Sequence, residues 1–258
     1  MWEVKEVVVR DEGSGTRLGK ELHGEAAKYW TEAWEINDDI FFDEETETRL
    51  VVHGDDFTFL GYPEQLERIE RKMKEWYEVK VRGTLGSDPG DEKNITILNR
   101  EVSWDGENIT YTADRKHAKT IIEEMDLKEE SKGLSWPGMK EEATIKEEGG
   151  GEEEELSKEE AKHFRKVAAR ANYLGLDRMD IQFAVKEACR EMAKPTVGGL
   201  RKLKRLARYL AQAPRVDIEF DGEGVEEVVD AYSDSDWAGC RESRKSTSGG
   251  IVAWGAVQ

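Results

Sequence analysis

The sequence predicts an α+β protein in which antiparallel strands precede and follow a block of helices. The dipeptides Gly54-Asp55 and Asp105-Gly106 each stand between β-prone arms, and such pairs favour tight hairpin turns. Between about 158 and 212, apolar residues recur with helical spacing. Two or three further β-prone runs close the chain. We therefore expect antiparallel sheet on both sides of a helical middle.

Composition limits the kind of protein this can be. The 258 residues are 37% hydrophobic and 37% charged, which predicts a soluble chain with a lean core. No apolar stretch approaches the length that crosses a bilayer, and residues 1–6 lack the apolar block of a secretory signal. Cys189 and Cys240 lie far apart without metal-ligand spacing. We expect an intracellular protein, cytoplasmic or nuclear and not secreted, with reduced thiols and no membrane partner.

The charge is unevenly distributed along the chain. The net charge of −18 argues at first against nucleic acid, because phosphate binding draws on lysine and arginine. Residues 141–160 contain ten glutamates and two lysines, whereas residues 194–215 contain seven cations and no acid. Because the distribution matters more than the sum for a local binding face, the basic segment stays a candidate.

The first third of the chain is expected to alternate strand and helix. Residues 1–35 are too weakly patterned to assign, apart from helical spacing over 26–34. A short strand over 40–42 leads into the first hairpin, which covers 50–61. A helix is expected after Pro63, because apolar residues there form one stripe. The stripe contains Leu66, Ile69, Met73 and Trp76.

Strands are next expected over 77–81, 95–104 and 108–112, the last two joined by the second hairpin turn. Asp114 can cap the following helix. The apolar residues of that helix are Ala118, Ile121, Ile122 and Met125.

The segment over 128–156 is predicted to be an acidic, flexible linker, because its glycines and glutamates cannot bury enough apolar surface to order it. Ser157 and Glu160 then form a capping box that begins the helical block. Helices are expected over about 158–175, 179–193 and 198–212, and strands over 216–220, 228–234 and 248–254.

Two acidic positions are candidates for chemistry. Asp55 and Asp56 stand at the tip of the first hairpin, where adjacent carboxylates can hold a divalent ion and support chemistry on phosphates. Asp234 lies late in a predicted strand, beside a second strand. The alternatives are an ordinary hairpin turn in the first case, as Asp38-Asp39 illustrates elsewhere, and a polar turn in the second.

Several segments, taken in order, resemble the Pol polyprotein of copia-type retrotransposons. The run over 51–56 resembles the catalytic hairpin of the reverse transcriptase, and the runs over 77–80, 85–86 and 97–99 resemble the palm segments that follow it. The helical connection is matched over 171–174, 178–181, 183–185, 195 and 203–210. The start of ribonuclease H is matched over 232–239 and 244–249. The resemblance spans about 40–256.

The resemblance implies a domain plan. After a poorly assigned segment over 1–35 comes a partial reverse-transcriptase palm with an antiparallel sheet over 36–127. The acidic linker over 128–156 leads to a helical connection over 157–215. A truncated, ribonuclease H-like antiparallel β edge over 216–258 completes the plan.

The resemblance also implies a chemistry. In a complete relative, Asp55, Asp56 and a further aspartate from an earlier strand would hold two Mg²⁺ ions, or Mn²⁺, while Asp234 would begin a second two-metal site that cuts RNA. The implied partners are an RNA or DNA template-primer, dNTPs and the remaining Pol segments. His53 stands where the family usually has tyrosine, and no earlier segment resembles the strand with the further aspartate. We therefore expect weak metal binding and little or no turnover by this chain alone.

The basic helix over 200–209 has two interpretations. Its cations can contact template-primer phosphates, which would position a duplex without reading its sequence. Alternatively, they form an ordinary solvated face. The cations are Arg201, Lys202, Lys204, Arg205 and Arg208.

Three functions remain open at this point. The first is a fragment of an RNA-directed DNA polymerase with ribonuclease H. The second is a non-catalytic remnant that still binds nucleic acid. The third is an acidic structural or interaction protein in which the Asp55-Asp56 turn is incidental.

Overall fold

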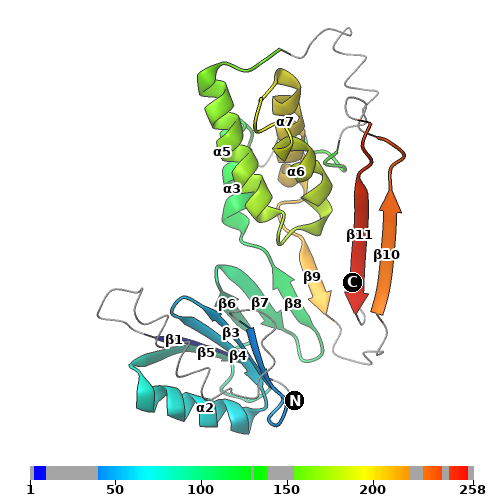
Figure 1. Ribbon diagram of the computed structural model, residues 1–258. Coiled ribbons are helices and arrows are strands. Elements are labelled where there is room, and N and C mark those ends of the chain that lie inside the picture. Colours follow the sequence, from blue (N-terminus) through cyan, green and yellow to red (C-terminus); the bar gives the residue numbers. More distant parts are fainter. Residues whose placement is uncertain are drawn as a thin grey trace. The chain divides into compact units, whose positions relative to one another are not determined.

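The computed structural model describes residues 3–9, 40–128, 131–138, 154–220, 229–239 and 244–254. They fall into two compact units, Met1–Thr110 with Glu219–Gln258 and Tyr111–Ile218 (Figure 1). In chain order, the elements are β1 Glu3–Val9, β2 Ile40–Asp43, β3 Thr48–His53, β4 Asp56–Gly61, α2 Pro63–Trp76, β5 Val79–Leu85, β6 Asn94–Ile97, β7 Arg100–Trp104, β8 Ile109–Thr112, α3 Arg115–Glu124, α5 Lys158–Leu174, η1 Met179–Ile181, α6 Gln182–Cys189, α7 Val197–Gln212, β9 Asp217–Phe220, β10 Val229–Ser235 and β11 Ser248–Trp254.

The first unit is built on a five-stranded sheet with the order β2-β3-β4-β1-β5, whose neighbouring pairs are antiparallel. Burial alternates along β3 and β4, as expected for strands with one covered face. The helix α2 covers that face (Figure 1). The shared core consists of Phe41, Leu50, Val52, Phe57, Phe59, Leu66, Ile69 and Met73.

The stripe predicted for α2 is confirmed at three of its four positions. Leu66, Ile69 and Met73 are buried, and Pro63 starts the helix at the position where a missing N–H costs least. Trp76, in the last turn, is 39% exposed. The rest of its surface lines a small pocket together with Phe57, Phe59 and Ile69.

The strand β1 was not predicted, because residues 1–35 show little periodicity. It nevertheless lies inside the sheet, hydrogen-bonded to β4 on one side and to β5 on the other. The pairing with β5 shifts register between Glu6 and Val7, whose partners are Gly83 and Val81. Arg82 is therefore the extra residue of a β-bulge. The helical spacing predicted over 26–34 lies outside the described residues.

A second sheet has the order β6-β7-β8-β9. The single strand predicted over 95–104 is wrong: it is two strands, which turn at Leu98 and Asn99 and pair Ile97 with Arg100. Both turn residues have positive φ, 49° and 65°. Asparagine can adopt a positive φ, so this two-residue turn forms without glycine. Because glycine is the strong signal for such a turn in a sequence, the turn was not predicted.

The other hairpin turn of this sheet is confirmed. Gly106 has a φ of 114°, and the Asp105 side chain accepts hydrogen bonds from the backbone N–H groups of Glu107 and Asn108 at 2.9 and 2.8 Å. Here aspartate and glycine together supply the turn, as the sequence indicated.

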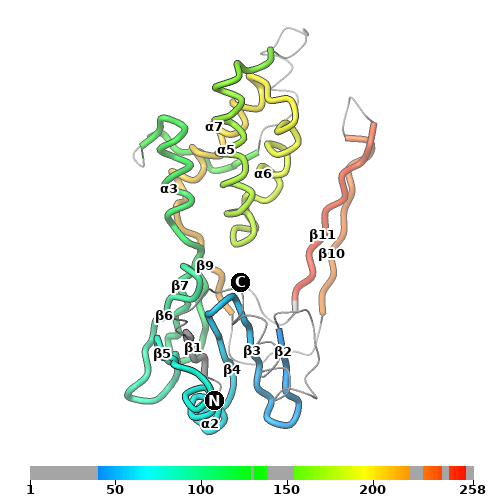
Figure 2. The backbone as a smooth tube through the Cα atoms, turned by 60° about the vertical axis from the view of Figure 1, so that its left-hand side comes forward, coloured from blue at the N-terminus to red at the C-terminus, as the bar shows by residue number. Residues whose placement is uncertain are grey.

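The second unit is a group of helices, α3, α5, α6 and α7, around one apolar core (Figure 2). The capping box at Ser157 and the Asp114 cap of α3 are both confirmed. The helix α3 was placed with the palm segment over 36–127, but it packs against α5 and α7, because Ala118, Ile121 and Ile122 join the helical core.

Part of the predicted linker is attached to this helical unit. The backbone N–H of Leu134 donates to the carbonyl of Arg208, and Arg208 Nε donates to the carbonyl of Lys132 at 3.0 Å. Residues 139–153, which contain most of the linker's glutamates and glycines, lie outside the described residues.

The strands β10 and β11 form an antiparallel pair whose register runs from Val229 with Trp254 to Ser235 with Ser248. All seven residues of β10 are exposed. A two-stranded hairpin without cover is only marginally stable in water. Over the described part of the chain, no helix has the length and apolar character needed to cross a bilayer.

Candidate metal centre and nucleic-acid interface

The acid hairpin, which we define as residues 53–56, has the predicted form. His53 pairs with Asp56 across the end of the ladder, and Gly54 and Asp55 make the turn. Gly54 has a φ of 64°, which glycine adopts without strain at the first position of a type II′ turn. A β-carbon on Gly54 would meet nothing within 4 Å, so its backbone conformation, and not space, explains glycine at this position.

The two carboxylates of the acid hairpin have different surroundings. Asp55 is exposed. Asp56 begins β4, its side chain is only 19% exposed, and its Oδ1 atom lies 3.3 Å from Nη2 of Arg82 on β5. One of the two predicted metal ligands is therefore already paired with a cation of the chain itself.

The neighbouring strand contributes no acid at the matching position. In the register of β1 with β4, Val8 is the partner of Asp56, and Val7 that of Phe57. The residue of β1 that pairs with Asp56 in the ladder is therefore a valine and not an acid.

This donor set does not fit the magnesium site that the resemblance implies. Mg²⁺ demands oxygen ligands in near-octahedral geometry, and it is usually held by carboxylates together with substrate phosphates. Within the described ranges, no group of three or more histidine, cysteine, aspartate or glutamate side chains could hold a metal ion.

Asp234, the predicted first ligand of a second metal site, lies on the exposed strand β10 and pairs with Gly249 of β11. Its Oδ1 atom accepts a hydrogen bond from the backbone N–H of Ser235 at 2.9 Å. The nearby Asp236 is tied to the start of β11, because its backbone N–H donates to the carbonyl of Thr247 at 3.1 Å. Asp234 thus stands on a hairpin, as predicted, and its metal-binding role stays a prediction.

The five cations of the basic helix fall into two groups on α7. Arg205 and Arg208 donate to the backbone carbonyls of Gly138 and Lys132 and so fasten the segment over 131–138. Arg201 and Lys204 are exposed.

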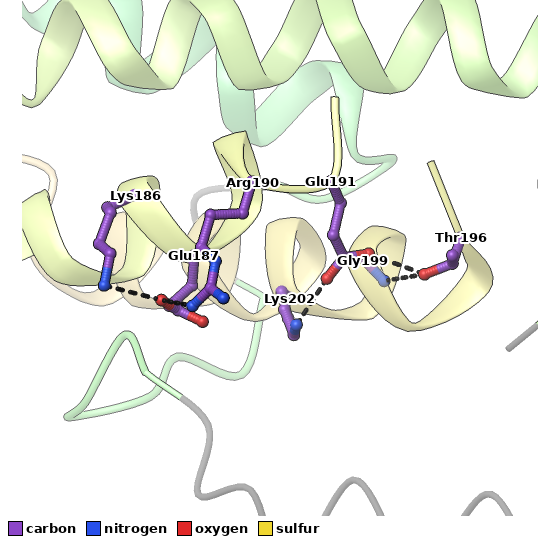
Figure 3. Close-up of polar contacts among 7 residues, drawn as sticks. All are labelled: Lys186, Glu187, Arg190, Glu191, Thr196, Gly199 and Lys202. Carbon is purple, nitrogen blue, oxygen red and sulfur yellow. Dashed lines mark hydrogen bonds and ion pairs between the residues drawn. The ribbon is translucent and has the colours of Figure 1, made fainter. Parts of the chain in front are cut away.

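The fifth cation, Lys202, belongs to a polar cluster at the start of α7 (Figure 3). Its Nζ atom lies 2.5 Å from Oε1 of Glu191, whose other oxygen accepts a hydrogen bond from Thr196 Oγ1 at 2.7 Å. Thr196 in turn caps the helix by accepting from the backbone N–H of Gly199. Lys202 is therefore engaged by groups of the chain itself, and phosphate contacts by these cations stay a prediction.

Two arginines have partners that the sequence did not predict. Arg82 is exposed, and its guanidinium contacts Asp56 of another strand. Arg178, only 2% exposed, forms hydrogen bonds with Asp180 and with the carbonyl of Ala213. Asp56 and Ala213 are distant from these arginines in the chain, so the local sequence held no signal for either contact.

Comparison with known proteins finds curated relatives for about a third of the chain. The chain is 40% identical over 92 residues to a retrovirus-related Pol polyprotein from transposon RE1 of Arabidopsis thaliana, and 38% identical over 92 residues to that from transposon RE2. About a third of the chain is homologous to retrotransposon Pol polyproteins. The resemblance predicted from the motifs is confirmed to that extent.

Other relatives are shorter or less informative. An uncharacterised mitochondrial protein of Arabidopsis thaliana, AtMg00810, is 36% identical over 104 residues, which cover 36% of this chain and 41% of that protein. The secreted RxLR effector protein 161 of Plasmopara viticola is 38% identical over 84 residues.

The matches to the RE1 and RE2 polyproteins cover 36% of this chain and only 6% of each polyprotein. No protein-family model and no solved structure matches the chain.

Proposed function

We propose that this chain is a segment of a retrotransposon Pol polyprotein, comprising part of a reverse-transcriptase palm, a helical connection and the start of a ribonuclease H sheet. The observation that carries the proposal is the acid hairpin, Gly-Asp-Asp at the end of two antiparallel strands, in a chain homologous to Pol polyproteins. In this proposal, RNA-directed DNA synthesis and RNA cleavage belong to the complete polyprotein, with template-primer, dNTPs and Mg²⁺ as its partners.

The isolated chain has little or no turnover in this proposal. The acid hairpin has two carboxylates, one of them paired with Arg82. The strand β10, which carries Asp234, is exposed along its whole length, as expected for a piece of a larger sheet. These two observations support assigning the chain an incomplete set of catalytic groups.

Primer extension tests the catalytic part of the proposal. We expect the purified chain, given an RNA template, a DNA primer, dNTPs and Mg²⁺ or Mn²⁺, to incorporate no more nucleotide than its Asp55→Asn variant. Robust incorporation that disappears in Asp55→Asn would show that the chain is catalytically complete and would overturn this part.

A second candidate function is a non-catalytic module that binds nucleic acid. It is favoured by the exposure of Arg201 and Lys204 on a helix whose segment over 194–215 contains no acid. Saturable binding of an RNA–DNA hybrid that weakens steeply with salt would support it. If no such binding occurs, the acidic structural or interaction protein becomes the better description.

A further inference from the structure

The ion pair between Arg82 and Asp56 spans a strand. The order β3-β4-β1-β5 places β1 between the strands that carry the two residues. Adjacent strands lie about 4.8 Å apart, so β4 and β5 are separated by roughly 10 Å. Arg82 Nη2 nevertheless lies 3.3 Å from Asp56 Oδ1, which means that the arginine side chain extends across β1 toward the acid hairpin.

The bulge in β5 explains how Arg82 comes to this position. Gly83 and Val81 pair with consecutive residues of β1, so Arg82 is the additional residue between them. A bulge bends the strand locally and re-aims the side chain of the extra residue. Arginine suits the task because its long stem reaches across a strand, and its planar guanidinium matches the geometry of a carboxylate.

We propose that the guanidinium of Arg82 is the resident cation of the acid hairpin, in place of a divalent metal ion. It lies beside Asp56 at the distance of an ion pair; the side chain of Asp56 is 19% exposed and that of Arg82 is 46% exposed. A metal ion that binds Asp55 and Asp56 must first displace this guanidinium. This pairing is a property of the hairpin itself, whether or not the chain derives from a polymerase.

Mn²⁺ binding to the full chain tests this proposal. Binding is measured by the loss of the free Mn²⁺ electron paramagnetic resonance signal, and located by the broadening of backbone amide NMR signals of residues 53–57. We expect Arg82→Gln to bind Mn²⁺ at the hairpin about fivefold more tightly than the unmodified chain, the upper range for a partly exposed ion pair. Adding Asp56→Asn to that variant should abolish the gain.

Lys80→Gln is the matched control, because Lys80 is an exposed cation on the same strand and its loss changes the net charge equally. We expect no gain at the hairpin in this variant. Three outcomes would each overturn the proposal. Mn²⁺ affinity at the hairpin could rise equally in Lys80→Gln and Arg82→Gln, it could rise in neither variant, or the rise in Arg82→Gln could persist when Asp56→Asn is added. If Arg82→Gln does not fold, Arg82→Ala and Arg82→Lys are compared by the same measurement, and only the alanine variant should show the gain.

Primer extension is a separate measurement, so a failure of the Mn²⁺ prediction leaves the polyprotein assignment untouched.

Discussion

The guanidinium of Arg178 forms an ion pair with the carboxylate of Asp180, only two residues further along the chain. Nε lies 2.8 Å from Oδ1, and Nη2 lies 2.7 Å from Oδ2, so the pair is bidentate. Nη2 also donates to the carbonyl of Ala213, and Tyr209 donates its hydroxyl proton to Asp180 at 2.7 Å. This network ties η1, which opens the α6 segment, to the end of α7.

Replacing Arg178 should lower the stability of the protein. The arginine side chain is 2% exposed, and that of Asp180 is 25% exposed. Arg178→Ala leaves a partly buried carboxylate without its cation, so we expect the free energy of unfolding to fall by about 3 kcal/mol. Urea denaturation followed by circular dichroism measures the change. Arg190→Ala, which removes an exposed partner of Glu187, should cost less than about 1 kcal/mol. Similar losses in both variants would contradict a special role for Arg178.

The same network predicts how stability depends on pH. Burial alone would raise the pKa of Asp180, but hydrogen bonds from Arg178 and Tyr209 outweigh it and leave the pKa below its ordinary value. Because the folded pKa lies below the unfolded one, the stabilisation is complete above the ordinary aspartate pKa of about 4. It is lost as the pH falls from there through the folded pKa.

The pH dependence is measured as the urea midpoint of the unmodified chain and of Asp180→Asn between about pH 6 and 3. We expect the stability difference between the two proteins to be constant above the ordinary aspartate pKa and to shrink below it. Taking the difference removes the contribution of the other carboxyl groups. A difference that stays constant down to the lowest pH would contradict a lowered pKa for Asp180.

The turn between β6 and β7 offers a stabilising change. Leu98 has a φ of 49°, a left-handed conformation that costs roughly 1–2 kcal/mol for a residue of this kind. Leu98→Asn should raise the free energy of unfolding by about 0.5–1 kcal/mol, because asparagine tolerates this conformation and is preferred in such turns. Leu98→Val, with a β-branched side chain, should lower it. Thermal unfolding of the three proteins ranks them, and a valine variant as stable as the asparagine variant would refute the turn geometry.

That turn also shows where sequence reasoning reached its limit. Asp105-Gly106 and Gly54-Asp55 were recognised because glycine permits a positive φ and aspartate binds its own backbone. The turn at Leu98-Asn99 depends instead on the pairing of β6 with β7, which forces a leucine into a conformation it does not prefer. Because this pairing is not visible in the local sequence, the residues around position 98 were predicted as one continuous strand.

Local signals predicted where the helices lie better than they predicted which elements pack together. The stripe of α2 and the caps at Asp114 and Ser157 are short-range features; both caps are confirmed, and so are three of the four positions of the stripe. The strand β1 acquires its place only from two partners more than forty residues away, and α3 joins its core through contacts with α5 and α7. Within the acid hairpin, the sequence located Asp55 and Asp56 but could not show that Arg82 crosses a strand to reach one of them.

The exposed face of α7 gives a last test, which separates a binding role from a structural one. Arg201 and Lys204 are exposed, whereas Lys202 is only 27% exposed and is paired with Glu191. If α7 contacts phosphates, Lys204→Gln should weaken binding of an RNA–DNA hybrid and lower the slope of log affinity against log salt by about one. Lys202→Gln should instead lower the unfolding midpoint, since it leaves Glu191 without its cation.

The two variants remove the same charge from positions only two residues apart on one helix, so a general electrostatic effect would change hybrid binding equally in both. Fluorescence anisotropy at several salt concentrations measures the binding, and urea denaturation measures the stability. A Lys204→Gln variant whose affinity and salt slope match those of the unmodified chain would assign the exposed cations of α7 to an ordinary solvated face. Because the acids of this chain give it a net charge of −18, any phosphate contact must come from such a local basic surface, and α7 carries the acid-free segment that best provides one.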